Sequence, residues 1–100
     1  MTIEIASTKS LEPGKMMAIE KNGKSILIAN VNGEYYAIGN ICTHMGCNLS
    51  DGTLEGHTVQ CACHGSKFNI KTGAVESGPA KDPEPSYPLN IEGNKILADL

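Results

Sequence analysis

The chain of 100 residues contains no arginine: all eight of its cationic residues are lysines, and the net charge is −3. Arginine is the side chain that grips phosphate and carboxylate groups through paired hydrogen bonds. Nucleic-acid-binding domains are usually basic as well, with their cationic residues gathered on one face. The composition therefore argues against nucleic acid as a partner.

The sequence also contains no long apolar run, and we expect no secretory leader. Its longest clean apolar stretch, Ile26–Ala29, is far shorter than the roughly 20 residues that span a bilayer as a helix. Residues 1–5 contain neither the basic segment nor the apolar segment of a signal peptide. We therefore expect no membrane span, and a cytoplasmic location.

A helical repeat of apolar residues is missing too, and short extended segments take its place. Asn22-Gly23 and Asn32-Gly33 separate apolar runs and predict tight hairpin turns, and Gly93 suggests a third. Residues 39–57 and 71–86 are predicted to be irregular. The sequence predicts a single all-β domain over residues 1–100, a small antiparallel sandwich or barrel. Strands are expected at residues 3–6, 16–20, 25–29, 34–38, 58–60, 66–70, 89–92 and 95–98.

Two short segments of the chain combine cysteine with histidine. Cys42 is followed by His44, Cys61 is followed by His64, and sixteen residues lie between His44 and Cys61. Each segment offers one thiolate and one imidazole, so the pair could hold a metal centre with two sulfur and two nitrogen ligands. A tetrahedral structural zinc site uses the same four donors, so a structural zinc module stays open on the ligands alone.

This doubled Cys-x-His and Cys-x-x-His pattern resembles the Rieske [2Fe-2S] family, in which two cysteines hold one iron and two histidines hold the other. The resemblance runs from Glu34 to Ala80. It implies one [2Fe-2S] cluster, two cluster-binding loops inside a subdomain at about 39–80, and a covering proline loop at residues 78–80. By the same resemblance, Cys42, His44, Cys61 and His64 are the iron ligands.

The resemblance also implies a function. A soluble Rieske-type ferredoxin carries one electron between redox partner proteins, a reductase and a terminal oxidoreductase, and we expect this one to be a monomer. A small redox subunit of a larger oxidoreductase is the alternative. Catalysis by a Rieske oxygenase needs a further iron on two histidines and a carboxylate, yet only His57 remains of three histidines. The chain is therefore expected to be a carrier and not an enzyme.

Two further cysteines refine the resemblance. The segments look like those of the cytochrome bc-complex branch, where such a pair forms a disulfide between the ligand loops; oxygenase-type ferredoxins usually lack it. Applied here, the bond would join Cys47 to Cys63, and its loop of roughly 17 residues implies about 3 kcal/mol of stabilisation. Two reduced thiols are the alternative, because disulfides are uncommon in the cytosol.

Nearby residues are expected to tune the cluster. By resemblance, the hydroxyl of Ser66 donates a hydrogen bond to a bridging sulfide. Gly46 and Gly65 should permit tight loop bends and offer their N–H groups to cluster sulfurs. Two neutral imidazoles in place of two thiolates make electron uptake easier, and their free N–H groups allow proton coupling. The dispersed acidic residues Glu76, Asp82 and Glu84 are expected to form a solvated face, with steering of a redox partner as the alternative.

Overall fold

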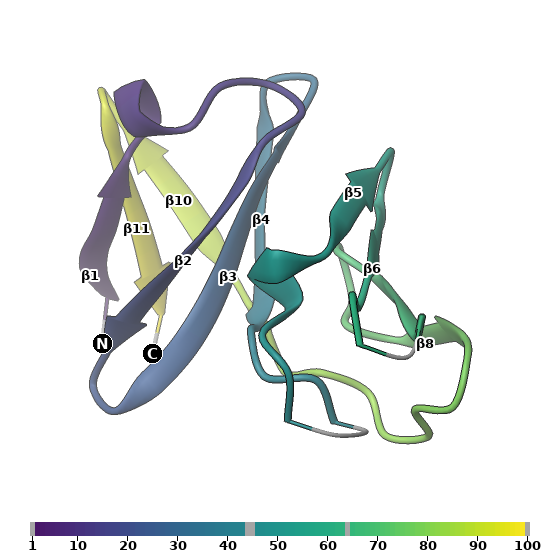
Figure 1. Cartoon of the computed structure of the whole chain (residues 1–100). Helices are drawn as coiled ribbons and strands as arrows, with labels where there is room; N and C mark the ends of the chain where they lie inside the picture. Colours follow the sequence, from purple (N-terminus) through teal and green to yellow (C-terminus); the bar gives the residue numbers. More distant parts are fainter. Residues whose placement is uncertain (1, 44–45, 64, 100) are drawn as a thin grey trace.

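The computed structural model describes residues 2–43, 46–63 and 65–99, and its regular secondary structure is almost entirely antiparallel strand, as predicted (Figure 1). Two 3-10 helices, η1 (Thr8–Ser10) and η2 (Leu49–Asp51), complete it. None of the helices described is long and apolar enough to cross a membrane. The strands are β1 (Thr2–Ser7), β2 (Met16–Lys21), β3 (Lys24–Val31), β4 (Glu34–Gly39), β5 (Thr53–Glu55), β6 (Thr58–Gln60), β7 (Lys67–Asn69), β8 (Val75–Ser77), β9 (Ser86–Tyr87), β10 (Leu89–Glu92) and β11 (Lys95–Asp99).

The strands form three sheets. A terminal sheet has the order β1-β11-β10, a central sheet the order β2-β3-β4-β9, and a distal sheet the order β5-β6-β7-β8. The terminal sheet lies on one side of the central sheet and the distal sheet on the other, to the right in Figure 1. The chain enters the distal sheet after β4 and returns through β9, so this sheet is an insertion between two neighbouring strands of the central sheet.

Strand β3 contains the longest apolar run of the sequence. The run is continuous because both faces of this strand are buried. Leu27, Ala29 and Val31 pack into a core shared with the distal sheet. Ile26 and Ile28 alternate with them and pack into a second core against the terminal sheet. A strand covered on both faces has no polar face to alternate with its apolar one.

The Asn-Gly hairpin turns are confirmed. Asn22 and Asn32 both have positive φ, 52° and 54°, and the glycine after each is also left-handed. The flanking pairs Lys21–Lys24 and Val31–Glu34 leave two-residue turns, and these conformations suit the twist of a hairpin.

Three strands lie in segments that the sequence predicted to be irregular: β5, β8 and β9. Each has two or three residues, which is too short to show an alternating pattern. Their pairing is set by neighbours, β5 by β6, β8 by β7 and β9 by β4. Hydrogen bonding to a neighbouring strand, and not a local sequence pattern, makes these segments extended.

Candidate metal centre

The two predicted ligand loops have the same backbone hydrogen bonds. In the first, the Cys42 N–H donates to the Cys47 carbonyl (2.7 Å) and the Gly46 N–H donates back to the Cys42 carbonyl (2.9 Å). In the second, the Cys61 N–H donates to the Ser66 carbonyl (2.8 Å) and the Gly65 N–H to the Cys61 carbonyl (3.1 Å). Cys42 and Cys61 thus occupy equivalent positions in two similar loops.

The glycines of these loops have the predicted conformation, but their N–H groups do not have the predicted hydrogen-bond partners. Gly46 and Gly65 have φ values of 76° and 78°, a left-handed conformation that glycine adopts without strain and that the tight bend requires. Their N–H groups, however, donate to carbonyls within their own loops. The expectation that these two N–H groups are offered to cluster sulfurs is therefore wrong, because closing the loops uses them.

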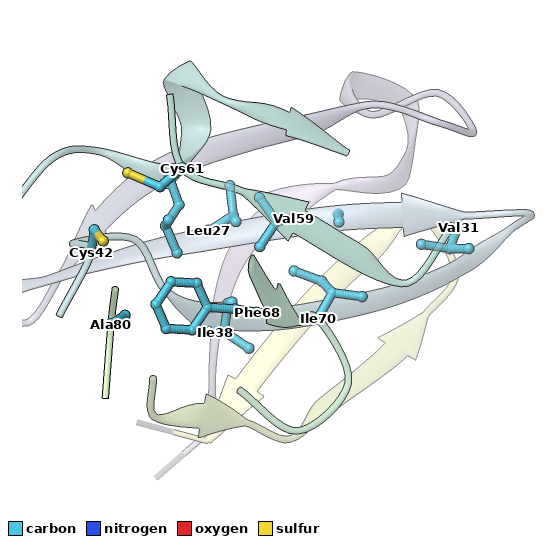
Figure 2. Packing of buried hydrophobic residues seen from close by; sticks show 11 residues of the cluster. Leu27, Val31, Ile38, Cys42, Val59, Cys61, Phe68, Ile70 and Ala80 are labelled. Carbon is cyan, nitrogen blue, oxygen red and sulfur yellow. The ribbon is translucent and has the colours of Figure 1, made fainter. Parts of the chain in front are cut away.

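Cys42 and Cys61 are the free cysteines of the described residues, and both are buried, at 3% and 2% exposure. Figure 2 shows their side chains at one end of the core between the central and distal sheets, near Phe68 and Ala80, with Val31 at the other end. Two unpaired thiols at equivalent loop positions, shielded from water, suit the cysteine-bound half of a [2Fe-2S] cluster. The described donor set therefore fits the group implied by the sequence. His44 and His64, the predicted imidazole ligands, lie outside the described residues.

The structure joins Cys47 to Cys63 through a disulfide, with the two Cα atoms 6.5 Å apart. The bond ties the end of the first ligand loop to the middle of the second. The Sγ atoms of Cys47, Cys61 and Cys63 all lie within 4.8 Å of one another, so the disulfide sits directly beside a free thiol of the site. This link holds the two loops together independently of any bound metal.

Removing this link should lower stability. We expect Cys47→Ser, Cys63→Ser and the double variant each to lose about 3 kcal/mol of unfolding free energy in denaturant, because each frees the same loop of the unfolded chain. Equal losses in the three variants are the signature of one bond. A wild-type protein whose mass does not increase on reduction, or losses that add up in the double variant, would contradict it.

Ser66 is completely buried and lies under the predicted proline loop. Its Oγ accepts a hydrogen bond from the Ala80 N–H (3.1 Å), so its own hydroxyl proton remains free to donate. A Cβ atom added to Gly78 would come within 2.6 Å of the Ser66 Cα, which shows how closely the loop packs on this residue. The arrangement suits a hydroxyl that donates into the site.

Sequence reasoning missed two residues that position the first loop. Asn40, buried at the end of β4, accepts the Ser50 N–H on its side chain (2.9 Å) and the Leu49 N–H on its carbonyl (2.7 Å), which closes the base of the loop. Thr43 donates its hydroxyl to the Asp82 carbonyl (2.7 Å) and ties the loop to the proline-rich segment. An asparagine two residues before Cys42 was the available signal for Asn40, and no local pattern marked Thr43.

Comparisons with known proteins agree with this geometry. A model of the Rieske [2Fe-2S] domain matches residues 1–88. The ferredoxin component of biphenyl 2,3-dioxygenase from Rhodococcus jostii (strain RHA1) is 37% identical over 97% of this chain and 91% of its own length. The ferredoxin of carbazole 1,9a-dioxygenase from Nocardioides aromaticivorans IC177 superposes with a TM-score of 0.94 at 26% identity, over 98% of this chain and 96% of its own. The ferredoxin solved in complex with the oxygenase of carbazole 1,9a-dioxygenase superposes with a TM-score of 0.91 at 26% identity, over 97% of this chain and 91% of its own.

These relatives do not support the assignment to the cytochrome bc-complex branch. They are ferredoxin components of dioxygenase systems. This chain nevertheless has the extra cysteine pair, which forms a disulfide in the structure. The pair is a local cross-link between two loops, and it can exist whichever protein receives the electron. The cysteine pair alone was therefore too weak a sign of the branch.

The broader predictions are confirmed. The cofactor is a Rieske [2Fe-2S] cluster, and not structural zinc, and the chain is a ferredoxin that transfers one electron between redox partner proteins. It is a carrier and not itself a catalyst. With the family model matching most of its length and these relatives matching nearly all of it, the chain belongs to the Rieske [2Fe-2S] domain family.

Proposed function

We propose that Cys42 and Cys61 hold one iron of the cluster and that His44 and His64 hold the other. The support is the pair of free, buried thiols at equivalent positions in two loops that are closed by the same backbone hydrogen bonds. In each loop a histidine follows two or three residues after the cysteine. When bound, the cluster supplies a one-electron couple.

The surrounding residues would set how that electron is held. Burial keeps water from the two thiolates, and Ser66, which keeps its proton while accepting from Ala80, would donate to a cluster sulfide. Such a donor stabilises the electron-rich state and raises the reduction potential. The Cys47–Cys63 link would keep both loops in register when the charge of the site changes.

We further propose that the chain is the ferredoxin of an aromatic-ring dioxygenase system, taking electrons from a reductase and passing them to a terminal oxygenase. The relatives that match nearly the whole chain are ferredoxin components of biphenyl and naphthalene dioxygenases. The complex of reduced oxygenase and oxidised ferredoxin in carbazole dioxygenase is the model for the encounter. This chain would be a carrier of that class with the inter-loop link typical of the other branch.

Three accompanying predictions belong to this proposal: one domain over residues 1–100 with its cluster-binding part at about 39–80, a monomer, and a cytoplasmic location. The insertion of the distal sheet between β4 and β9 agrees with the subdomain limits. Likeness to dioxygenase ferredoxins supports the location. A disulfide is uncommon in that compartment, where glutathione and thioredoxin keep thiols reduced.

Single-turnover electron transfer tests the proposed partner. The holoprotein would be chemically reduced, freed of reductant and mixed with the oxidised terminal oxygenase of a biphenyl-type dioxygenase. We expect its visible spectrum to return to the oxidised form as the oxygenase cluster becomes reduced. A holoprotein that stays reduced with the oxygenase but is oxidised by cytochrome c would contradict the dioxygenase assignment and favour the bc-complex type of partner.

A further inference from the structure

Glu84 is the one acidic residue among the buried polar side chains of the described chain. It is 4% exposed, and its Oε2 atom has no hydrogen-bond partner within the part of the chain that the structure describes. The expectation that this residue belongs to a solvated acidic face is therefore wrong. An unpaired carboxylate is costly to bury, so its position calls for a functional explanation.

The backbone around Glu84 holds the side chain inward. The Glu84 N–H donates to the Gly73 carbonyl (2.8 Å), and the next residue, Pro85, accepts the Gly39 N–H (2.9 Å). A Cβ atom on Gly39 would come within 2.5 Å of the Glu84 Oε1, so the carboxyl lies against the bare backbone at the end of β4. The two anchors leave the side chain packed between the central sheet and the turn at Gly73.

The carboxyl also faces the first ligand loop. The Thr43 backbone N–H donates a hydrogen bond to the Glu84 carboxyl. In sequence, Thr43 lies between Cys42 and His44, both proposed iron ligands. The Thr43 hydroxyl is bonded to the Asp82 carbonyl of the same proline-rich segment (2.7 Å). The loop that is proposed to hold the cluster and the segment that carries Glu84 are therefore fastened together.

Among the described residues, few charged or titratable groups lie near Glu84. Tyr87 of β9 interacts electrostatically with Glu84. Burial, and then the negative charge of Glu84, raise the pKa of the Tyr87 hydroxyl. Lys24 of β3 stacks on the Tyr87 ring, with Nζ 5.8 Å from its centre. Burial raises the pKa of Glu84 to about 7, and the Thr43 N–H lowers it only in part. Asp82, two residues before Glu84, is exposed.

We propose that Glu84 is a proton acceptor coupled to the electron: when the cluster gains an electron, the Glu84 carboxylate takes a proton from solvent and becomes a neutral carboxyl. This inference rests on the proposed ligand set. Reduction adds negative charge near the first loop, which disfavours a second negative charge behind it. Linkage is reciprocal, so a protonated Glu84 raises the reduction potential and an ionised Glu84 lowers it.

Glu84→Gln keeps the shape of the side chain and removes its charge. For the wild-type holoprotein we expect the reduction potential to fall as pH rises through about 7, by at most about 59 mV per pH unit for one proton per electron. For Glu84→Gln we expect the potential to stay at the wild-type's low-pH value across this range. Glu84→Leu also removes the charge, and we expect the same constant potential from it. It replaces Glu84→Gln in this experiment if the glutamine variant folds poorly.

Asp82→Asn is the matched control, because it removes one exposed carboxylate from the same segment. It should keep the wild-type pH dependence. A second readout is the reduced-minus-oxidised infrared spectrum, where a carboxylic acid band should appear on reduction in wild type and Asp82→Asn and be missing in Glu84→Gln. Equal pH profiles in wild type and Glu84→Gln, with the cluster intact by EPR, would overturn the inference alone. Absence of a Rieske EPR signal from the wild type would instead overturn the proposed function.

Glu84 should also affect the pH dependence of folding. Its pKa is about 7 in the folded chain, above the ordinary value of 4.5 that it has when unfolded. The folded state therefore binds the proton more tightly, and stability falls as pH rises from 4.5 through 7. We expect Glu84→Gln to raise the denaturation midpoint of the holoprotein more at about pH 8 than at about pH 5. The same increase at both pH values would show that the folded protein does not hold this carboxyl in its neutral form, and would count against the inference.

Discussion

Cys61→Ser is expected to leave the protein almost without iron and without the visible absorption of a [2Fe-2S] cluster. A serine hydroxyl stays protonated where a thiolate would bind, and it is a poor ligand for iron in a sulfur-rich site. Cys42→Ser should have the same effect, because the two cysteines hold equivalent positions in their loops. Iron and acid-labile sulfide per chain, together with the visible spectrum, measure the loss.

Ala62→Ser is the matched control, since it places the same side chain at an exposed position beside Cys61. It should retain full iron and the wild-type spectrum. Cys47→Ser is a second control for cysteine chemistry, because it removes a disulfide sulfur and no proposed ligand. A Cys61→Ser protein with the wild-type iron content would contradict the proposed ligand set.

Gly78→Ala is expected to destabilise the protein by about 2–5 kcal/mol, through two effects that add. Gly78 has a φ of 98°, a conformation that alanine adopts only with strain. Its new Cβ would also lie within 2.6 Å of the Ser66 Cα, a backbone atom that cannot turn aside. The proline-rich segment or Ser66 must then move, and the hydrogen bond from Ala80 to Ser66 should weaken. Chemical denaturation of the holoprotein measures the loss.

Gly14→Ala separates the two effects. Gly14 has a similar φ of 82°, but a Cβ atom there would meet nothing within 4 Å. Its cost should be the backbone strain alone, about 1–2 kcal/mol. The difference between the two variants is then the cost of the contact with Ser66. Equal losses in both would mean that the segment at residue 78 does not pack on Ser66 as described.

The sequence carried most of the fold where local chemistry determines structure. Asn22-Gly23 and Asn32-Gly33 predicted their hairpins because left-handed turns need residues that accept positive φ. The apolar run at Ile26–Ala29 predicted a strand. It did not show that this strand separates two cores, because burial of both faces depends on sheets that form far along the chain. The strands β5, β8 and β9 were not predicted because segments of two or three residues are too short to show an alternating pattern.

The site divides in the same way. The spacing of Cys42 and Cys61 from their histidines, together with the family pattern that it resembles, predicted these two residues as ligands, because metal ligands must be particular residue types at particular separations. The shared hydrogen bonding of the two loops was not evident, as their sequences match only at cysteine, histidine and glycine. Glu84 lies in a segment that has the composition of a solvated loop. Its burial comes from the contacts of that segment with Gly39 and Gly73, which are distant in sequence.

The central claim is a [2Fe-2S] cluster on two cysteines and two histidines, and a potentiometric titration followed by EPR, with pulsed detection of nitrogen coupling, tests it most directly. We expect one rhombic [2Fe-2S] signal that appears on one-electron reduction, coupling to two imidazole nitrogens, and a potential within the Rieske range of about −150 to +300 mV. A [2Fe-2S] signal without nitrogen coupling, at the potential near −400 mV typical of clusters with four cysteine ligands, would contradict the account.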